Sequence, residues 1–292
     1  KALLVIVQPG MEGGNAFADV ISGKVNPSGK LVDSWAYKYE DYPSAATFSH
    51  NNGNVEKEFY EEGLYVGYRY FDTFGIPVRY GFGYGLSYTT FEIQNASVKK
   101  EQTNLLKVSM SVKNTGAVAG KEVVQAYASL PGGSMEKEAH RLIAYAKTEL
   151  LQPGEAQSIT LEIPAECLIS YDEKKAAWVL EKGFYGIFLG NSLESANLTF
   201  GLQLDQDAVL EKVKNLFPLK DGLKELEQPA GATCKREAVQ AALARSKQLP
   251  VLELKAAEFK TKEIVYRKNS ELAAPEAMEF VNTLSVEELI NL

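Results

Sequence analysis

Glu12 is the carboxylate of this sequence that is best placed for chemistry. It follows the apolar run Ala2–Val7 and the turn Pro9-Gly10, and such a run has the pattern of a strand buried on both faces of a parallel sheet. Open α/β sheets bind their ligands beyond the carboxyl ends of the strands, so Glu12 is a candidate residue of a substrate cleft. The alternative is that Glu12 caps the following helix, where a carboxylate is favourable, and this role is the more frequent one.

Four further carboxylates, Asp33, Asp41, Glu61 and Glu62, stand in the same part of the chain. General acid and base catalysis needs two carboxyl groups at a fixed separation across the substrate. The linear spacing of these residues selects no such pair, and a hydrogen bond to a neighbouring tyrosine is the commoner role of a single acid. The sequence therefore assigns no catalytic residue.

The sequence predicts no metal site and no cofactor. His50 and His140 are the only histidines, and neither has a second ligand at the spacing of a zinc site. The glycines of Gly81–Gly85 do not have the spacing of a dinucleotide fingerprint, so we interpret this segment as a glycine-aromatic turn.

Composition excludes several classes of protein. The 292 residues carry a net charge of −7 with a pI near 5.2, which argues against a nucleic-acid partner. The longest apolar stretch, Ala2–Val7, is too short to cross a membrane. Cys167 and Cys234 do not make a disulfide framework. The cellular location stays open, with a cytoplasmic one slightly favoured.

Residues 1–88 are expected to be the tail of an α/β domain. The run Ala2–Val7 predicts a buried strand, Asn15–Ile21 a short helix and Leu31–Trp35 a second strand. Two strands cannot form a covered parallel sheet, so we expect the rest of that domain upstream. Residues 37–88 are rich in Tyr, Phe and Gly, which indicates an ordered connector packed by its aromatic rings.

Residues 89–205 predict an all-β domain. Val108, Met110 and Val112 alternate with polar residues, as in a strand with one face in water. About seven such strands, separated by short turns, favour an antiparallel sandwich of the immunoglobulin or fibronectin type. Trp178 is expected in its core.

Residues 206–282 change again to a Lys-, Glu-, Leu- and Ala-rich composition and predict a partly helical connector. Val209–Leu216 and Glu237–Leu249 are expected to be helices, and Glu253–Arg267 is either a strand or an extended linker. In residues 283–292, Ser285 followed by Glu288 is a capping box, which begins a further helix.

Several separated segments, in order, resemble glycoside hydrolase family 3, the family of β-glucosidases and β-xylosidases. The resemblance covers about residues 3–204. Its segments are Gln8–Ala16 (QPGMEGGNA), Gly23–Leu31 (GKVNPSGKL), Tyr60–Tyr70 (YEEGLYVGYRY), Phe82–Phe91 (FGYGLSYTTF), Val112–Gly116 (VKNTG), Gly120–Tyr127 (GKEVVQAY) and Leu151–Glu155 (LQPGE).

The resemblance implies a retaining mechanism with its catalytic residues elsewhere. In that family an aspartate on a TIM-like barrel is the nucleophile, and a glutamate upstream of the segment similar to residues 3–16 is the acid. Neither motif occurs in this chain. Thr283–Leu292 resembles the opening helix of the family's barrel, which implies a domain-permuted member whose barrel follows the fibronectin-like domain.

The resemblance therefore implies a segment of a retaining β-glycosidase that acts on terminal β-linked glucosides or xylosides. The expected partners are a small β-glycoside or oligosaccharide and the missing barrel domain, without nucleic acid or membrane. A non-catalytic carbohydrate-binding or structural module remains the main alternative. An adhesion-type sandwich protein is a third possibility, which the α/β motifs of residues 1–88 argue against.

Overall fold

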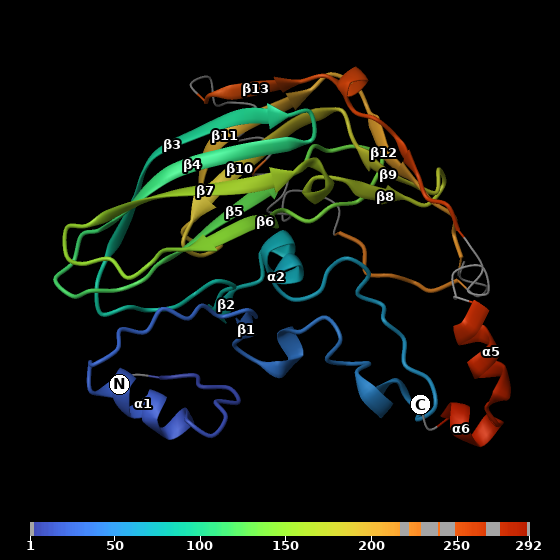
Figure 1. Cartoon of the computed structure of the whole chain (residues 1–292), viewed down its shortest axis with the longest axis horizontal. Helices are drawn as coiled ribbons and strands as arrows, with labels where there is room; N and C mark the ends of the chain where they lie inside the picture. The colour runs from blue at the N-terminus through green and yellow to red at the C-terminus, as the bar shows by residue number, and fades with distance from the viewer. Residues whose placement is uncertain (1–2, 217–221, 229–238, 240–248, 267–274, 291–292) are drawn as a thin grey trace.

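The computed structural model describes residues 3–216, 222–228, 239, 249–266 and 275–290 (Figure 1). An α/β N-terminal part lies beside an all-β sandwich, and short strands and helices follow. The predicted combination of an α/β region with an all-β sandwich is confirmed. None of the helices among these residues has the length and apolar character of a membrane span.

The sandwich consists of two antiparallel sheets whose inner faces share one core, with a parallel strand added to one of them. The first sheet has the order β3-β4-β7 and the second the order β13-β11-β10-β5-β6. Their strands are β3 (Phe91–Gln102), β4 (Leu105–Asn114), β7 (Ala156–Pro164), β5 (Val123–Ser129), β6 (Arg141–Lys147), β10 (Gly183–Gly190), β11 (Asn197–Leu204) and β13 (Val251–Leu254).

Alternation along β4 explains the core. Val108, Met110 and Val112 are buried, whereas the residues between them face outward. Val108 pairs with Leu161 of β7 and Met110 with Ile159, so both strands present their apolar faces to the same side. These side chains pack against residues of β5, β10 and β11 in one cluster, which is the arrangement that a two-sheet sandwich requires.

A third sheet, in the order β14-β12-β9-β8, continues the sandwich. Its strands are β8 (Ser170–Asp172), β9 (Ala177–Leu180), β12 (Ala208–Lys212) and β14 (Lys262–Glu263). The prediction that Trp178 lies in the core is wrong, because its side chain is 38% exposed. Ala177 and Val179 point inward, and the alternation of a strand therefore turns Trp178 outward.

The helix predicted for Val209–Leu216 is also wrong. Residues Ala208–Lys212 form β12, which pairs antiparallel with β9. Ala208 and Leu210 share the buried face, so the apolar residues fit a strand period as well as a helix period. A helix this short is marginal in water, whereas the edge of β9 offers backbone hydrogen-bond partners on both sides of a register shift between Val209 and Glu211.

The N-terminal part contains less sheet than expected. The predicted helix is confirmed as α1 (Gly13–Ile21), but Leu3–Val7 forms no strand and its side chains are 39% to 84% exposed. No strand among the described residues lies beside this run, and an unpaired strand has no stable form. The strand predicted at Leu31–Trp35 is reduced to β1 (Trp35–Ala36), which pairs with β2 (Val78–Tyr80). A helix not expected from the sequence, α2 (Tyr68–Phe74), follows within the aromatic region.

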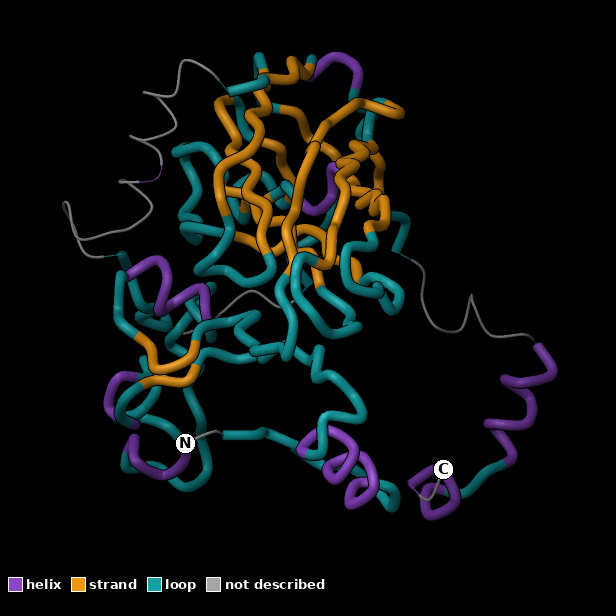
Figure 2. Tube along the Cα trace, turned by 90° about the vertical axis from the view of Figure 1, so that its left-hand side faces the viewer, coloured by secondary structure: helices purple, strands orange, loops and turns teal. Residues whose placement is uncertain are grey.

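The C-terminal part adds strands to the sandwich and then leaves it. β13 runs parallel to β11 and β14 runs parallel to β12, so strand structure occurs within the segment Glu253–Arg267, for which the sequence allows either a strand or a linker. Helices α5 (Pro275–Thr283) and α6 (Val286–Ile290) lie apart from the sandwich in both views (Figures 1 and 2). The helix predicted for Glu237–Leu249 falls almost entirely outside the described residues.

The capping box that begins α6 is confirmed. The backbone N–H of Ser285 donates to the Glu288 carboxylate at 2.8 Å, and the N–H of Glu288 donates back to the Ser285 hydroxyl at 3.2 Å. These bonds satisfy backbone donors that the first turn of a helix leaves without partners.

Candidate functional site

Glu12 is exposed in the position directly before α1. Its Oε2 accepts a hydrogen bond of 2.6 Å from the side-chain amide of Asn15, and its side chain accepts none from a backbone N–H of the helix. The residue thus has the position of a helix cap without the bond that usually defines one. The observed side-chain partner of Glu12 is an amide and not a second carboxyl group. Catalysis by an acid and a base across a substrate needs two carboxyl groups, so Glu12 alone cannot provide it.

The other four candidate carboxylates have no hydrogen bond or ion pair in common with Glu12 among the described residues. Asp33 is exposed, and Asp41 accepts a hydrogen bond of 3.0 Å from the backbone N–H of Lys38 within a short turn. Glu61 and Glu62 lie in the loop before α2, and their backbone carbonyls accept hydrogen bonds from the N–H groups of Leu226 and Tyr65.

The histidines likewise form no metal centre in the described part of the chain, where no group of three potential ligands comes together. His140 is buried and its Nδ1 lies 2.7 Å from Oδ2 of Asp72. The side chain of His50 lies outside the described part. In the turn Gly81–Gly85, the Phe82 ring packs against Tyr127 of the sandwich, and the Tyr84 ring packs against Tyr80.

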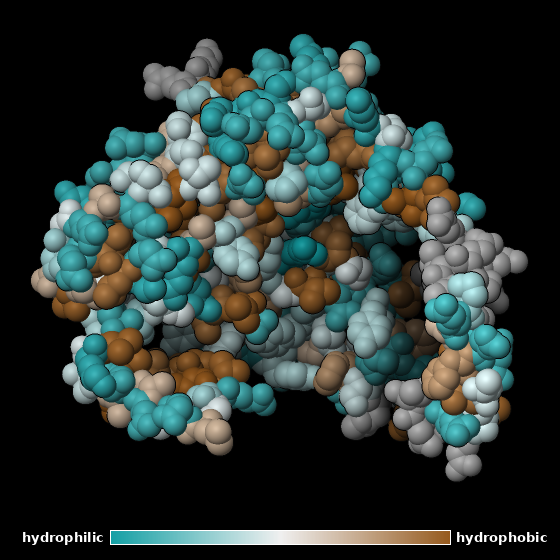
Figure 3. All heavy atoms as spheres, viewed as in Figure 1, coloured by the Kyte–Doolittle hydropathy of each residue, from teal (hydrophilic) through white to brown (hydrophobic). Residues whose placement is uncertain are grey.

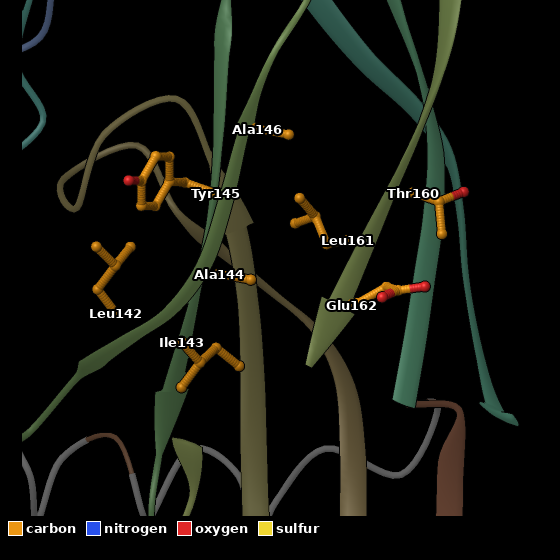
Figure 4. Close-up of a pocket in the computed structure, with 8 residues that line it drawn as sticks. All are labelled: Leu142, Ile143, Ala144, Tyr145, Ala146, Thr160, Leu161 and Glu162. Carbon is orange, nitrogen blue, oxygen red and sulfur yellow. The ribbon is translucent and has the colours of Figure 1, made fainter. Parts of the chain in front are cut away.

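A cavity of about 580 Å³ lies between the edge strands β6 and β7 (Figure 4). Ala144 and Ala146 point toward β7, and Leu161 points toward β6, whereas Tyr145 points away from the gap. Its one carboxylate, Glu162, forms an ion pair with Lys107 at 3.3 Å. The cavity is an opening between two sheets with a mixed polar and apolar lining, and its lining residues include no pair of acids.

The polar residues of the family-like segments instead build a junction between the N-terminal part and the sandwich. Asn26 is at its centre. Its amide donates to the carbonyl of Ala119 at 3.1 Å, and its carbonyl accepts from the Ser87 hydroxyl at 3.0 Å and the Tyr88 N–H at 2.9 Å. A Cβ on Gly120 would lie 2.5 Å from this amide, so only glycine permits the close approach.

A buried ion pair completes the first junction. Lys30 Nζ lies 2.9 Å from Oε1 of Glu122, and the two side chains are only 12% and 7% exposed. Glu122 also accepts hydrogen bonds from the Val123 N–H at 2.7 Å and the Asn191 amide at 2.8 Å. A buried charge with this many partners is well compensated, and removing either partner would leave the other without compensation.

The second junction joins α2 to the segment that leads into β6. Besides the pair of Asp72 with His140, the Thr73 hydroxyl accepts from the Ala139 N–H at 2.9 Å, and the Tyr68 hydroxyl accepts from the Leu142 N–H at 2.9 Å. Burial raises the pKa of the Tyr68 hydroxyl above its ordinary value, because an ionised phenolate in this position would lose its hydration.

Aromatic rings fill the space behind the second junction. The Tyr68 ring lies 4.5 Å from that of Phe82 and 6.4 Å from that of Tyr127, measured between centroids. Burial strongly raises the pKa of the Tyr127 hydroxyl. The aromatic packing expected for residues 37–88 is therefore observed, and through Tyr68 and Phe82 it reaches the Tyr127 ring of the sandwich.

Two buried carboxylates stabilise the loop before β6. Glu181 is paired with Lys137 and also accepts from the Ser134 N–H at 2.8 Å, whereas Glu138 is paired with Arg141 at 2.6 Å. Burial pushes the pKa of both carboxyls upward, but the hydrogen bonds and charges of Lys137 and Arg141 outweigh burial and hold both pKa values below the ordinary value. Lys137 and Glu181 are distant in sequence and meet only in the folded chain, whereas Glu138 and Arg141 are three residues apart.

Two family models match the chain. Residues 1–68 match the glycosyl hydrolase family 3 C-terminal domain, and residues 122–193 match a fibronectin type III-like domain. The matches follow the same order as the segments of the predicted resemblance, which is thereby confirmed.

Curated relatives and solved structures agree with the models. The chain is 44% identical over 239 residues to β-glucosidase A of Butyrivibrio fibrisolvens, a match that spans 74% of the chain and 28% of that protein. It is 38% identical to an exo-α-(1→6)-L-arabinopyranosidase of Bifidobacterium breve, over 68% of the chain and 26% of that protein.

Among solved structures, β-glucosidase 3B of Thermotoga neapolitana in complex with α-D-glucose aligns with a TM-score of 0.66 at 41% identity. This alignment covers 70% of the chain and 28% of that structure. The chain thus spans less than a third of the length of the relatives it matches.

Proposed function

We propose that this chain, which carries the C-terminal domain of glycoside hydrolase family 3 and a fibronectin type III-like domain, is a segment of a retaining β-glycosidase. The whole protein hydrolyses terminal β-linked glucosides or xylosides. The observation that carries this proposal is the pair of family models in sequence order, together with relatives named as β-glucosidases.

The catalytic carboxyl groups belong to polypeptide outside this segment. A retaining glycosidase needs two carboxyls about 5 to 5.5 Å apart. The five acids that the sequence offers in the N-terminal part do not form such a pair, and the buried Glu122, Glu138 and Glu181 are each held by a cation. The role of the chain is to support the catalytic parts and to contribute to the walls of the cleft, where Glu12 remains a candidate.

The exposed apolar face of the N-terminal part supports this arrangement. Hydrophobic side chains gather low on the face shown in Figure 3, over the N-terminal segment. Leu3, Val7 and Ile21 are 65%, 84% and 61% exposed, which is unusual for residues of a folded domain. We assign this face to the remainder of the α/β domain, with Leu3–Val7 as one of its strands.

The order of domains is a further part of the proposal. Helix α6, with its capping box, begins the TIM-like barrel, so that the barrel follows the fibronectin-like domain in a permuted protein. Val286 and Leu289 of this helix are 74% and 44% exposed, as expected for a helix whose packing partners lie in the barrel. Residues 206–282 then act as the connector between sandwich and barrel.

The whole protein could instead act on a glycoside of a different sugar. The relative from Bifidobacterium breve is named as an arabinopyranosidase and is 38% identical, close to several of the β-glucosidases. A non-catalytic module with the same domains is the alternative of another class, and an assay of the whole protein separates the two.

Activity of the purified chain and of the full-length product of its gene tests the proposal. We expect no turnover of aryl β-D-glucosides, β-D-xylosides or α-L-arabinopyranosides by residues 1–292, and turnover of at least one of them by the full-length protein. Replacing the barrel aspartate by Asn and the upstream glutamate by Gln should each abolish it. Turnover by residues 1–292 alone would refute the placement of the catalytic groups, and an inactive full-length protein would favour the non-catalytic module.

A further inference from the structure

The outer face of the third sheet carries a row of side chains that none of the roles above requires. In the register of the sheet Tyr171 of β8 lies opposite Trp178 of β9, Trp178 opposite Glu211 of β12, and Glu211 opposite Lys262 of β14. Directly opposed residues of neighbouring strands point to the same face. Two aromatic rings, a carboxylate and an ammonium group therefore form one line across four strands.

The two rings lie partly open to solvent. Trp178 is 38% exposed, and its ring centroid lies 5.3 Å from that of Tyr171 at an interplanar angle of 49°. The strand positions on either side of each ring are buried. The inward side chains thus hold the backbone in place while the rings cover the outer surface.

The Tyr171 ring is fixed before any ligand binds. Its hydroxyl donates to the side-chain carbonyl of Asn215, and the amide of Asn215 donates to the backbone carbonyl of Glu173 at 3.1 Å. The N–H of Val213 donates to the carbonyl of Ala176 at 2.9 Å, so that a further backbone bond joins the chain after β12 to the chain before β9. A surface whose side chains are already ordered loses little conformational entropy on binding.

We propose that this row, Tyr171–Trp178–Glu211–Lys262, is a binding site for a β-linked glucan or xylan chain. In a β-linked pyranose with equatorial hydroxyls, the axial C–H bonds make a flat apolar face that packs on the electron-rich face of an aromatic ring. One sugar stacks on Trp178. Its hydroxyls, and those of the next sugar, donate to the Glu211 carboxylate and accept from the Lys262 ammonium.

The charges in the row favour a carbohydrate over a protein surface as the occupant. The centre of a protein interface is depleted of Lys and Glu, whereas a polyhydroxylated ligand satisfies both groups by hydrogen bonds without burying them. Neighbouring strands are about 4.8 Å apart, so the line from Trp178 to Lys262 is about 10 Å long, which suits a disaccharide unit. The inference does not depend on hydrolysis, and its test uses this chain without a catalytic partner.

Fluorescence gives a direct readout, because Trp35 and Trp178 are the only tryptophans. In a Trp35→Phe variant all indole emission comes from Trp178. Titration with cellohexaose or xylohexaose should shift this emission saturably, and maltohexaose, with its α-linkages, should not shift it. No change with either β-linked hexaose would overturn the proposal.

Retention in native gels that contain β-glucan or xylan provides the second measurement. Trp178→Ala should weaken the apparent affinity at least tenfold, Tyr171→Ala and Glu211→Gln by severalfold, and Trp178→Phe should retain part of it. Tyr145→Ala is the matched control, because Tyr145 is an aromatic residue of another strand that is 70% exposed. Equal retention of Trp178→Ala and Tyr145→Ala would contradict the assignment.

Acrylamide quenching of Trp178 in the full-length protein distinguishes a protein occupant. If quenching is much weaker there than in residues 1–292, the face is covered by another domain and the proposal fails. A melting temperature of Trp178→Ala within a few degrees of that of the parent chain establishes that lost binding is not lost folding.

Discussion

At the scale of residues, the strongest electrostatic features of the chain are structural. Glu122, Glu138 and Glu181 are buried and each lies beside a cation, whereas the acids that the sequence offered for catalysis are exposed or half-buried. Removing one partner of a buried pair is costly because the other charge is left in a medium that solvates it poorly.

Lys137→Met tests the pair of Lys137 with Glu181. We expect a loss of about 3 to 5 kcal/mol in the free energy of unfolding, because the Glu181 carboxylate stays buried without its cation. Chemical denaturation measures it. Lys212→Met is the control, since its pair with Glu263 is 59% and 73% exposed and such pairs contribute about 0 to 1 kcal/mol. Similar losses in both variants would show that the first pair is not buried in solution.

The pH dependence of stability follows from the same groups. The pKa values of Glu138 and Glu181 lie below their ordinary value of 4.5 in the folded chain. Their contribution is therefore complete above the unfolded pKa and is lost as pH falls through the folded pKa. We expect the melting temperature to fall below about pH 4.5 and to fall less steeply in Glu181→Gln. An unchanged slope in this variant would contradict the assignment.

At the scale of elements, β9 shows how one strand divides its side chains between core and solvent. Leu180 is fully buried, whereas Trp178, two residues earlier, is 38% exposed. Leu180 is the last residue of β9 and leads into the turn before β10. Ala177, Val179 and Leu180 are all buried, so the strict alternation of inward and outward side chains ends at Leu180. The size of a residue therefore does not predict its burial here.

Two alanine substitutions in β9 measure this division. Leu180→Ala should lower the free energy of unfolding by about 2 to 5 kcal/mol, because it leaves a cavity in the core. Trp178→Ala should cost less than about 1 kcal/mol, since the ring lies on the surface. Urea denaturation of both variants decides the point, and a larger loss for Trp178→Ala than for Leu180→Ala would place the indole in the core after all.

At the scale of the whole molecule, the N-terminal part depends on the sandwich for its position. Between Leu3 and Ala36 it has one helix and a two-residue strand, and the bonds of Asn26, Lys30 and Tyr88 hold it against the β-domain. Segments that are far apart in the sequence, such as those of Asn26, Ser87 and Ala119, therefore meet at this junction.

Asn26→Ala should release the N-terminal part without unfolding the sandwich. It leaves the Tyr88 N–H and the Ala119 carbonyl without a partner, at about 1 to 3 kcal/mol for such groups. We expect limited proteolysis within residues 1–36 to become several-fold faster, while the main thermal transition stays within a few degrees. Asn15→Ala, which removes only an exposed bond to Glu12, should leave the cleavage rate unchanged.

The sequence by itself determined the features that depend on local periodicity and local hydrogen bonds. The alternation of β4 and β7, helix α1 and the Ser285–Glu288 capping box were all predictable, because a strand period, a helix period and a cap are encoded within a few residues. The ordered motifs likewise predicted the two domains that the family models match.

Tertiary structure alone decided the features that depend on a neighbour. Leu3–Val7 has the composition of a buried strand but forms none without a strand beside it, and Val209–Leu216 has a helical pattern but pairs with β9 over its first part. The outward orientation of Trp178 could not be predicted, because a short apolar run does not indicate which positions of β9 face the core. Ion pairs such as Lys30 with Glu122 join residues distant in sequence, and only the packed fold brings such charges within contact.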